Sequence, residues 1–116
     1  MKDELLGTLG QIASTSDALL TDTELNDLQR KFLLAIYQSS NNLRDWVITI
    51  PDLTWERAAE ILSYEGREQL SSIIGYAEVL LEEAEGDLDH RQRGSVHEIR
   101  SMGKRLLTRL SQWFET

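Results

Sequence analysis

Residues 11–20 read QIASTSDALL, and residues 72–81 read SIIGYAEVLL. Aligned at an offset of 61, the two stretches share their apolar positions and an acidic residue that precedes paired leucines by two places. Further along, Gln29-Arg30 matches Gln92-Arg93 at an offset of 63. Self-similarity of this kind indicates a repeated structural unit, so the chain is predicted to contain two copies of one unit.

Around these stretches, apolar or small residues recur at spacings of three and four, which is the period of a helix that buries one face. The first helix is expected to bury Leu5, Leu9, Ile12, Ser16 and Leu19. The second is expected to bury Leu25, Leu28, Phe32, Ala35, Ser39, Leu43, Trp46 and Ile50. For the third and fourth we expect Ala59, Leu62, Gly66, Gln69, Ile73, Ala77, Leu80 and Ala84, then Val96, Ile99, Met102 or Gly103, Leu106, Leu110 and Trp113.

Turn and cap residues separate the four helices at 21–24, at Pro51 and at 85–89. Pro51 lacks a backbone donor and disfavours helical geometry in the residue before it. A single hairpin cannot bury its own apolar face, whereas two similar hairpins can pack together. We therefore expect an all-α antiparallel four-helix bundle with pseudo-twofold symmetry. It forms one domain over 1–116, with hairpin one in 1–50 and hairpin two in 53–116.

Composition excludes several classes of function. The net charge is −8, divided equally between residues 1–52 and 53–116, so neither half has the excess of Lys and Arg that a nucleic-acid partner requires. The absence of cysteine excludes disulfides and thiolate chemistry. No apolar run is long enough to cross a bilayer, and residues 1–4 (MKDE) carry a net negative charge instead of the basic start of a signal peptide. A cytoplasmic protein without membrane contact is therefore expected.

Residues 63–81, SYEGREQLSSIIGYAEVLL, resemble the first helix of the dimerisation and histidine phosphotransfer domain of sensor histidine kinases. That family reads S-H-E-L-R-T-P-L, followed by an apolar G-x-A-E-x-L-L stretch. Residues 99–107 are similar to the family's second helix, while 3–9 and 22–43 show the same two features in the first half. The resemblance implies a helical hairpin in each half and a role in two-component signalling.

The family's phosphorylated histidine falls on Asp3 in the first copy and on Tyr64 in the second. A carboxylate or a phenol cannot replace imidazole in phosphorus–nitrogen chemistry, so we expect no autophosphorylation, no catalytic residue and no enzyme activity. Tyr64 lies two residues from Leu62 and from Gly66, which is about 200° of helical rotation, and Asp3 has the same relation to Leu5. Both residues are therefore expected to point outward.

The resemblance thus implies a non-catalytic interaction module whose partner is a response regulator receiver or a histidine kinase domain. The docking surface expected around the two degenerate phosphoacceptor positions consists of Glu4, Glu65, Arg67 and Glu68. Glu4 and Glu65 retain the acidic neighbour of the family's histidine, and Arg67 retains its basic position. A monomeric pseudo-dimer is expected, with a homodimer as the alternative.

Two other functions remain open. His97 is followed one and two turns later by Arg100 and Lys104, an arrangement that would suit a histidine phosphotransferase. Alternatively, the chain is a structural oligomerisation bundle of a larger sensor protein, with Trp55 as an exposed anchor.

Neither a metal nor a cofactor is expected. The acidic run 82–89 beside His90 lacks the alternating Asp/Asn pattern of a calcium loop, and the paired Glu-x-x-His motifs of di-iron bundles do not occur. Trp46 and Trp113 fall on the seam, meaning the predicted buried face of each helix, and are expected to pack in the core. Small residues on the seam, Gly66 and the pair Ser39 and Ser40, indicate either close helix approach or a local weakness.

Overall fold

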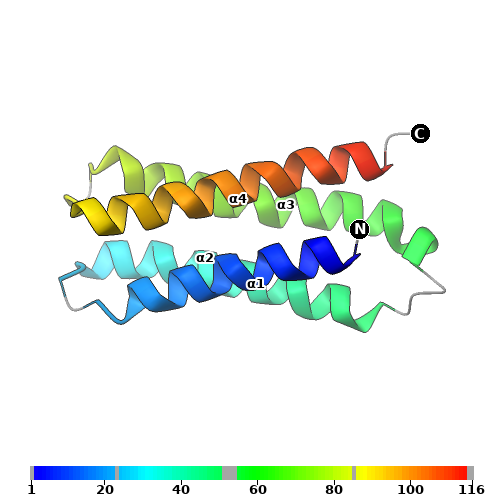
Figure 1. The fold of residues 1–116 in the computed structure, drawn as a ribbon, viewed down its shortest axis with the longest axis horizontal. Coiled ribbons are helices and arrows are strands. Elements are labelled where there is room, and N and C mark those ends of the chain that lie inside the picture. The colour runs from blue at the N-terminus through cyan, green and yellow to red at the C-terminus, as the bar shows by residue number, and fades with distance from the viewer. Residues whose placement is uncertain (1, 23, 51–54, 85, 115–116) are drawn as a thin grey trace.

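The structure is a computed structural model that describes residues 2–22, 24–50, 55–84 and 86–114, without the side chains of 55–57, 59–61 and 114. It contains the helices α1 (Lys2–Leu20), α2 (Asp27–Thr49), α3 (Trp55–Glu82) and α4 (His90–Phe114). They alternate in direction and form an elongated bundle measuring 46 × 23 × 18 Å (Figure 1). The predicted boundary at Pro51 and the side chain of Trp55 lie outside the described residues.

Each helix packs against two neighbours. Contacts join α1 to α2, α2 to α3, α3 to α4 and α4 to α1, and within the described residues the diagonal pairs make no comparable contact. Two hairpins therefore lie side by side, and the prediction of an all-α antiparallel four-helix bundle is confirmed. Among the described residues, none of the helices combines the length and hydrophobicity that crossing a bilayer requires.

The second helix of each hairpin begins with the same local structure. Asn26 accepts a hydrogen bond from the backbone N–H of Gln29, whose side chain accepts one from the backbone N–H of Asn26. Asp89 and Gln92 form the same reciprocal pair, with distances of 2.7 and 2.9 Å. A capping box of this kind satisfies two backbone donors that the first turn of a helix otherwise leaves unpaired. The matching Gln-Arg landmarks of the sequence thus mark equivalent helix starts.

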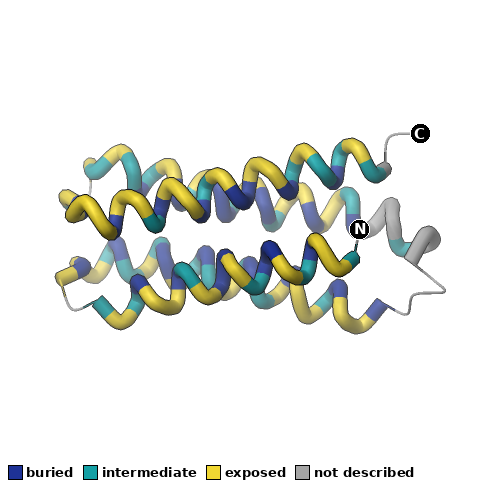
Figure 2. Tube along the Cα trace, viewed as in Figure 1, coloured by how far each residue is buried: buried dark blue, intermediate teal, exposed yellow. Residues whose placement is uncertain are grey.

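The core repeats with the same two offsets as the sequence, and its residues face the bundle axis from all four helices (Figure 2). At an offset of 61 between α1 and α3, both members are buried in the pairs Leu5/Gly66, Leu9/Leu70, Ile12/Ile73, Ala13/Ile74, Ser16/Ala77 and Leu19/Leu80. At an offset of 63 the pairs are Leu25/Leu88, Gln29/Gln92, Leu33/Val96, Ile36/Ile99, Ser40/Gly103, Leu43/Leu106 and Val47/Leu110. Buried Thr8, Ile50 and Met102 have half-buried counterparts. The two hairpins are therefore equivalent around one interior.

The predicted seam of the second helix was wrong over most of its length. Leu25, Leu43 and Ile50 are buried as predicted, but Leu28, Phe32, Ala35, Ser39 and Trp46 are only half-buried. The buried track runs one residue further along, through Gln29, Leu33, Ile36, Ser40 and Val47. Both polar side chains are hydrogen-bonded: Gln29 accepts from the backbone N–H of Asn26 and donates to the carbonyl of Asp87, and Ser40 donates to the carbonyl of Tyr37 at 2.9 Å. The apolar pattern therefore missed the buried face, because two of its positions are polar.

The other predicted seams are largely correct. All five positions in α1 are buried, as are those in α4 except Trp113, which is half-buried like Trp46 and packs against the core. In α3, Gln69 is half-buried, and Ala84 is exposed beyond the end of the helix, because the helix stops at Glu82. The predicted Ala59 side chain lies outside the described residues.

Gly66 and Gly103 occupy points of close approach between α3 and α4. A Cβ atom added to Gly66 would lie 2.9 Å from Leu110 Cδ1, and one added to Gly103 would lie 3.0 Å from Ile74 Cγ1. Real Cβ contacts are longer, so neither position has room for a side chain without movement of its neighbour. Of the two interpretations of Gly66, close approach is therefore correct.

Candidate functional site

The two positions predicted to be degenerate phosphoacceptors lie on outer faces of the bundle. Asp3 is exposed on α1, and Tyr64 is 72% exposed on α3. These helices run parallel to each other on opposite corners of the bundle, so the two positions do not share one surface. Both side chains point outward, as predicted from their position two residues from a buried residue of the same helix.

Tyr64 borders a shallow depression of ≈ 310 Å³ together with Arg67, Glu68 and Ser71. All four residues come from α3, so the depression is a surface feature of a single helix. Arg67 and Glu68 therefore remain beside Tyr64, as the predicted docking surface requires. The local chemistry is an aromatic ring flanked by one cation and one anion.

Glu4 is already bound within the chain. Its carboxylate accepts two hydrogen bonds from Arg109, from Nε at 3.2 Å and from Nη2 at 2.9 Å. The hydrogen bond and positive charge of Arg109 hold the pKa of Glu4 below its ordinary value of 4.5. The guanidinium of Arg109 also lies over the ring of Trp113, 5.2 Å from its centroid. Glu4 thus connects α1 to α4.

Glu65 belongs to a different groove from Tyr64. It lines a volume of ≈ 270 Å³ between α2 and α3, together with Asn42, Leu43, Trp46 and Gln69. The predicted docking surface is therefore divided among three places. Glu4 lies at the α1–α4 contact, Glu65 in the α2–α3 groove, and Arg67 and Glu68 beside Tyr64.

His97 is exposed on α4 and borders a depression with Glu78, Leu81, Glu82 and Arg100. Arg100, one of the two cations that follow His97, has its Nε atom 3.9 Å from a carboxylate oxygen of Glu78. The carboxylates of Glu78 and Glu82 line the same depression as His97, and their negative charge opposes an incoming phosphoryl group. The surroundings of His97 are thus poorly suited to phosphate transfer.

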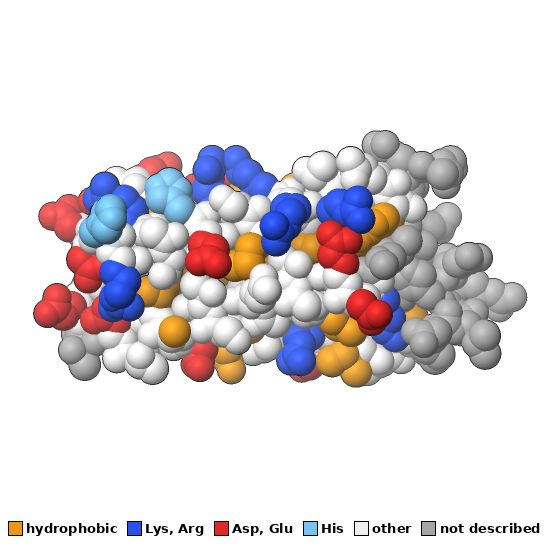
Figure 3. All heavy atoms as spheres, in the orientation of Figure 1, with side chains coloured by type: hydrophobic (Ala, Val, Ile, Leu, Met, Phe, Trp, Pro, Cys, Tyr) orange, Lys and Arg blue, Asp and Glu red, His pale blue; other side chains and the backbone are white. Residues whose placement is uncertain are grey.

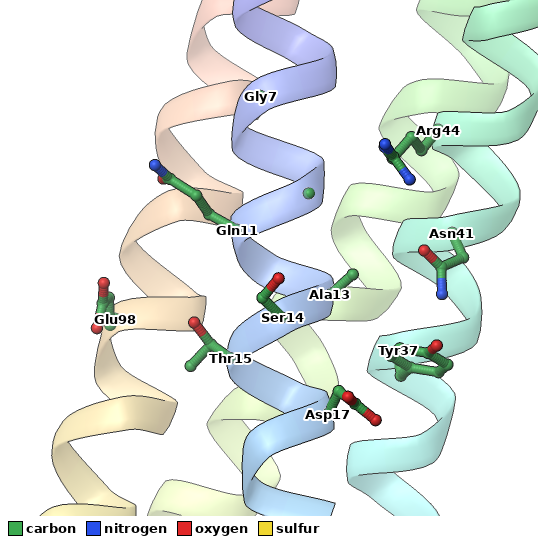
Figure 4. Close-up of a pocket in the computed structure, with 11 residues that line it drawn as sticks. Gly7, Gln11, Ala13, Ser14, Thr15, Asp17, Tyr37, Asn41, Arg44 and Glu98 are labelled. Atoms are coloured by element: carbon green, nitrogen blue, oxygen red, sulfur yellow. The ribbon is translucent and has the colours of Figure 1, made fainter.

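A broad groove of ≈ 620 Å³ crosses the outer face of α1, where Gly7, Gly10 and Ser14 provide little bulk. Figure 4 shows Tyr37, Asn41 and Arg44 directed toward it from α2, with Glu98 of α4 at the opposite edge. This groove was not predicted from the sequence. The small residues on the outward face of α1 were its one sequence signal, but the opposing residues of α2 lie about 30 positions away.

The loop end of the bundle carries a polar network that joins the hairpins. Gln29 Nε2 donates to the carbonyl of Asp87 at 3.2 Å, and Gln92 Nε2 donates to Asp22 Oδ2 at 2.7 Å. A backbone hydrogen bond from Glu24 and that from Gln92 lower the pKa of Asp22 from its ordinary value of 3.8. Each hairpin therefore holds the loop of the other through an equivalent glutamine.

Among the described residues, no group of three or more His, Cys, Asp or Glu side chains is placed to hold a metal ion. His90 is exposed at the first residue of α4. Comparison with protein-family models, curated proteins and solved structures returned no match to this chain.

Proposed function

We propose that this protein is a non-catalytic signalling module that binds a response regulator receiver or a histidine kinase domain. The observation that carries the proposal is the matched burial of two successive hairpins around one core. This arrangement fits two tandem copies of the phosphotransfer hairpin that the sequence resembles. One polypeptide then provides the bundle that the family forms as a dimer.

The chemistry at the two acceptor positions supports binding rather than catalysis. Asp3 and Tyr64 are exposed where the family carries its histidine, and neither side chain can form a phosphohistidine. Tyrosine offers a large contact area and few rotatable bonds, and it is enriched among residues that dominate interfaces. The Tyr64 surface, defined by Tyr64, Arg67, Glu68 and Ser71, is therefore the docking site in this proposal.

The two alternatives have weaker support. Relay through His97 would have to overcome the repulsion from Glu78 and Glu82. An oligomerisation bundle would need an apolar face to share, whereas the four helices already enclose one core.

The proposal is tested by immobilising this protein on a sensor surface and measuring the binding of purified receiver and kinase domains from the same organism. We expect at least one partner to bind, and Tyr64→Ala to weaken that binding about tenfold or more, as for an interface hot spot. Leu34→Ala is the matched control, because Leu34 is another exposed large hydrophobic residue, 44% exposed on α2. An absence of binding to every partner, or equal losses in the two variants, would contradict the proposal.

The same proteins test the relay. Incubation with a phosphorylated receiver is expected to leave no acid-labile phosphate on the chain. Phosphate that appears on the wild-type protein and is absent from His97→Gln would instead establish the phosphotransferase.

A further inference from the structure

The α2–α3 groove has a counterpart on the opposite side of the bundle. The offsets of 61 and 63 that relate the hairpins assign to each residue of this groove an equivalent at the α1–α4 contact. The equivalent pairs are Glu65/Glu4, Gln69/Thr8, Asn42/Arg105, Leu43/Leu106 and Trp46/Arg109. The molecule thus presents the same site twice with different residues.

In the α1–α4 copy an arginine fills the site. Arg109 binds Glu4 with both a 2.9 Å and a 3.2 Å hydrogen bond and lies over the indole of Trp113. This bidentate geometry is specific to the planar guanidinium group. The α1–α4 contact therefore shows that a glutamate at this position binds a guanidinium group.

In the α2–α3 copy that arginine is missing. Trp46 takes the place of Arg109, and Glu65 makes no ion pair with the described residues. A groove of ≈ 270 Å³ remains next to the Glu65 carboxylate, with the half-buried indole of Trp46 as one of its walls. A carboxylate and an aromatic face both attract a cation.

We propose that this groove, hereafter the Trp46–Glu65 groove, binds an arginine side chain presented by a partner protein. Glu65 pairs with the guanidinium, Trp46 stacks on it, and the amide oxygens of Asn42 and Gln69 accept its remaining N–H groups. The net charge of −8 favours a basic partner segment. This binding site goes beyond the proposed function, because it relies on neither Asp3 nor Tyr64 nor on the family resemblance.

The test is an NMR titration of the ¹⁵N-labelled protein with the peptide acetyl-Gly-Arg-Gly-amide, followed at the Trp46 indole and at the Gln69 amide. We expect saturable shifts at both positions. The same peptide with citrulline, the neutral isostere of arginine, should produce none. Glu65→Gln should weaken binding about tenfold, the loss expected when a charged partner is removed. Asp45→Asn, an equal change of charge at an exposed residue of α2 outside the groove, should leave binding unchanged.

A second variant reproduces the closed copy. Trp46→Arg places a guanidinium within reach of Glu65, so the Gln69 amide should no longer respond to the peptide. Equal shifts with the citrulline peptide or with acetyl-Gly-Lys-Gly-amide, or unchanged binding by Glu65→Gln, would overturn the proposal. Shifts that depend on protein concentration without peptide would also overturn it, because the occupant would then be a second copy of the chain. The probe is a small peptide, so this outcome is independent of whether a receiver or kinase binds.

Discussion

At the scale of single residues, two buried glutamines connect the hairpins. Gln29 and Gln92 are each 3% exposed, yet both ends of each amide are paired. The oxygen completes a capping box on its own helix, and the nitrogen reaches the loop of the other hairpin. A buried polar group is costly unless it is paired in this way, so the two residues hold the loops in one arrangement.

Gly86 contributes to the same contact. Its φ of +142° lies in the region that favours glycine, and its Cα faces the side chains of Asn26 and Gln29. The loop between α3 and α4 can therefore pack tightly on the start of α2.

Acidification should weaken the fold through Glu4 and Asp22. Both carboxyl groups have a lower pKa in the folded protein than their ordinary values of 4.5 and 3.8. Their contribution to stability is therefore complete above those values and is lost as the pH falls through the folded pKa. The free energy of unfolding in urea, measured from neutral pH to about pH 2, should decrease most steeply below the ordinary values.

The double variant Glu4→Gln/Asp22→Asn provides the comparison, because it lacks both titrating groups. At neutral pH it should be less stable than the wild type, and the difference should shrink with acidification. A difference that stays constant or grows as the pH falls would show that these carboxylates do not stabilise the fold.

At the scale of elements, the two hairpins fill equivalent positions with different volumes. Leu5 and Val47 correspond to Gly66 and Leu110, and Ala13 and Ser40 correspond to Ile74 and Gly103. In α3 and α4 a glycine accompanies a larger residue on the facing helix, as the short distances to Leu110 and Ile74 show. The two hairpins thus divide side-chain volume differently between facing helices, while the equivalent positions stay buried in both.

Gly66→Leu should destabilise the bundle by about 1–3 kcal/mol, because the added side chain would overlap the buried Leu110. Gly75→Leu in the same helix is the control. A Cβ at Gly75 meets nothing within 4 Å, so that change should stabilise the helix by up to about 1 kcal/mol. Chemical denaturation followed by circular dichroism measures both effects.

Adding Leu110→Val to Gly66→Leu recreates the Leu–Val combination of hairpin one. The double variant should be more stable than Gly66→Leu alone, although Leu110→Val alone removes core volume. Simple addition of the two losses would mean that the positions are not equivalent in the two hairpins.

The fold was predictable from sequence because helical periodicity is a local signal and because the repeat can be found by comparing the two halves of the sequence. The buried face of α2 was not predictable in the same way, because the polar residues Gln29 and Ser40 occupy core positions. The outward direction of Asp3 and Tyr64 followed from the geometry of one helix. The neighbours of Glu4 and Glu65 could not be predicted in this way, because Arg109 is 105 residues from Glu4 and Trp46 lies on a different helix from Glu65. Tertiary packing alone decides such neighbours.

At the scale of the whole molecule, the protein is a closed bundle with charges of both signs spread over its surface. Figure 3 shows acidic and basic side chains interspersed on one face, without a continuous basic patch among the described residues there. The core residues of all four helices form one cluster. Among the described residues one chain supplies this whole cluster, and a monomer is expected.

Sedimentation equilibrium over a wide range of protein concentrations tests whether one chain closes the core by itself. If two equivalent hairpins close one core within a single chain, the protein should sediment as a monomer of 13.3 kDa at every concentration. A species of twice that mass that persists on dilution would show that the hairpins pair between chains, and the account of a dimer contained in one polypeptide would be contradicted.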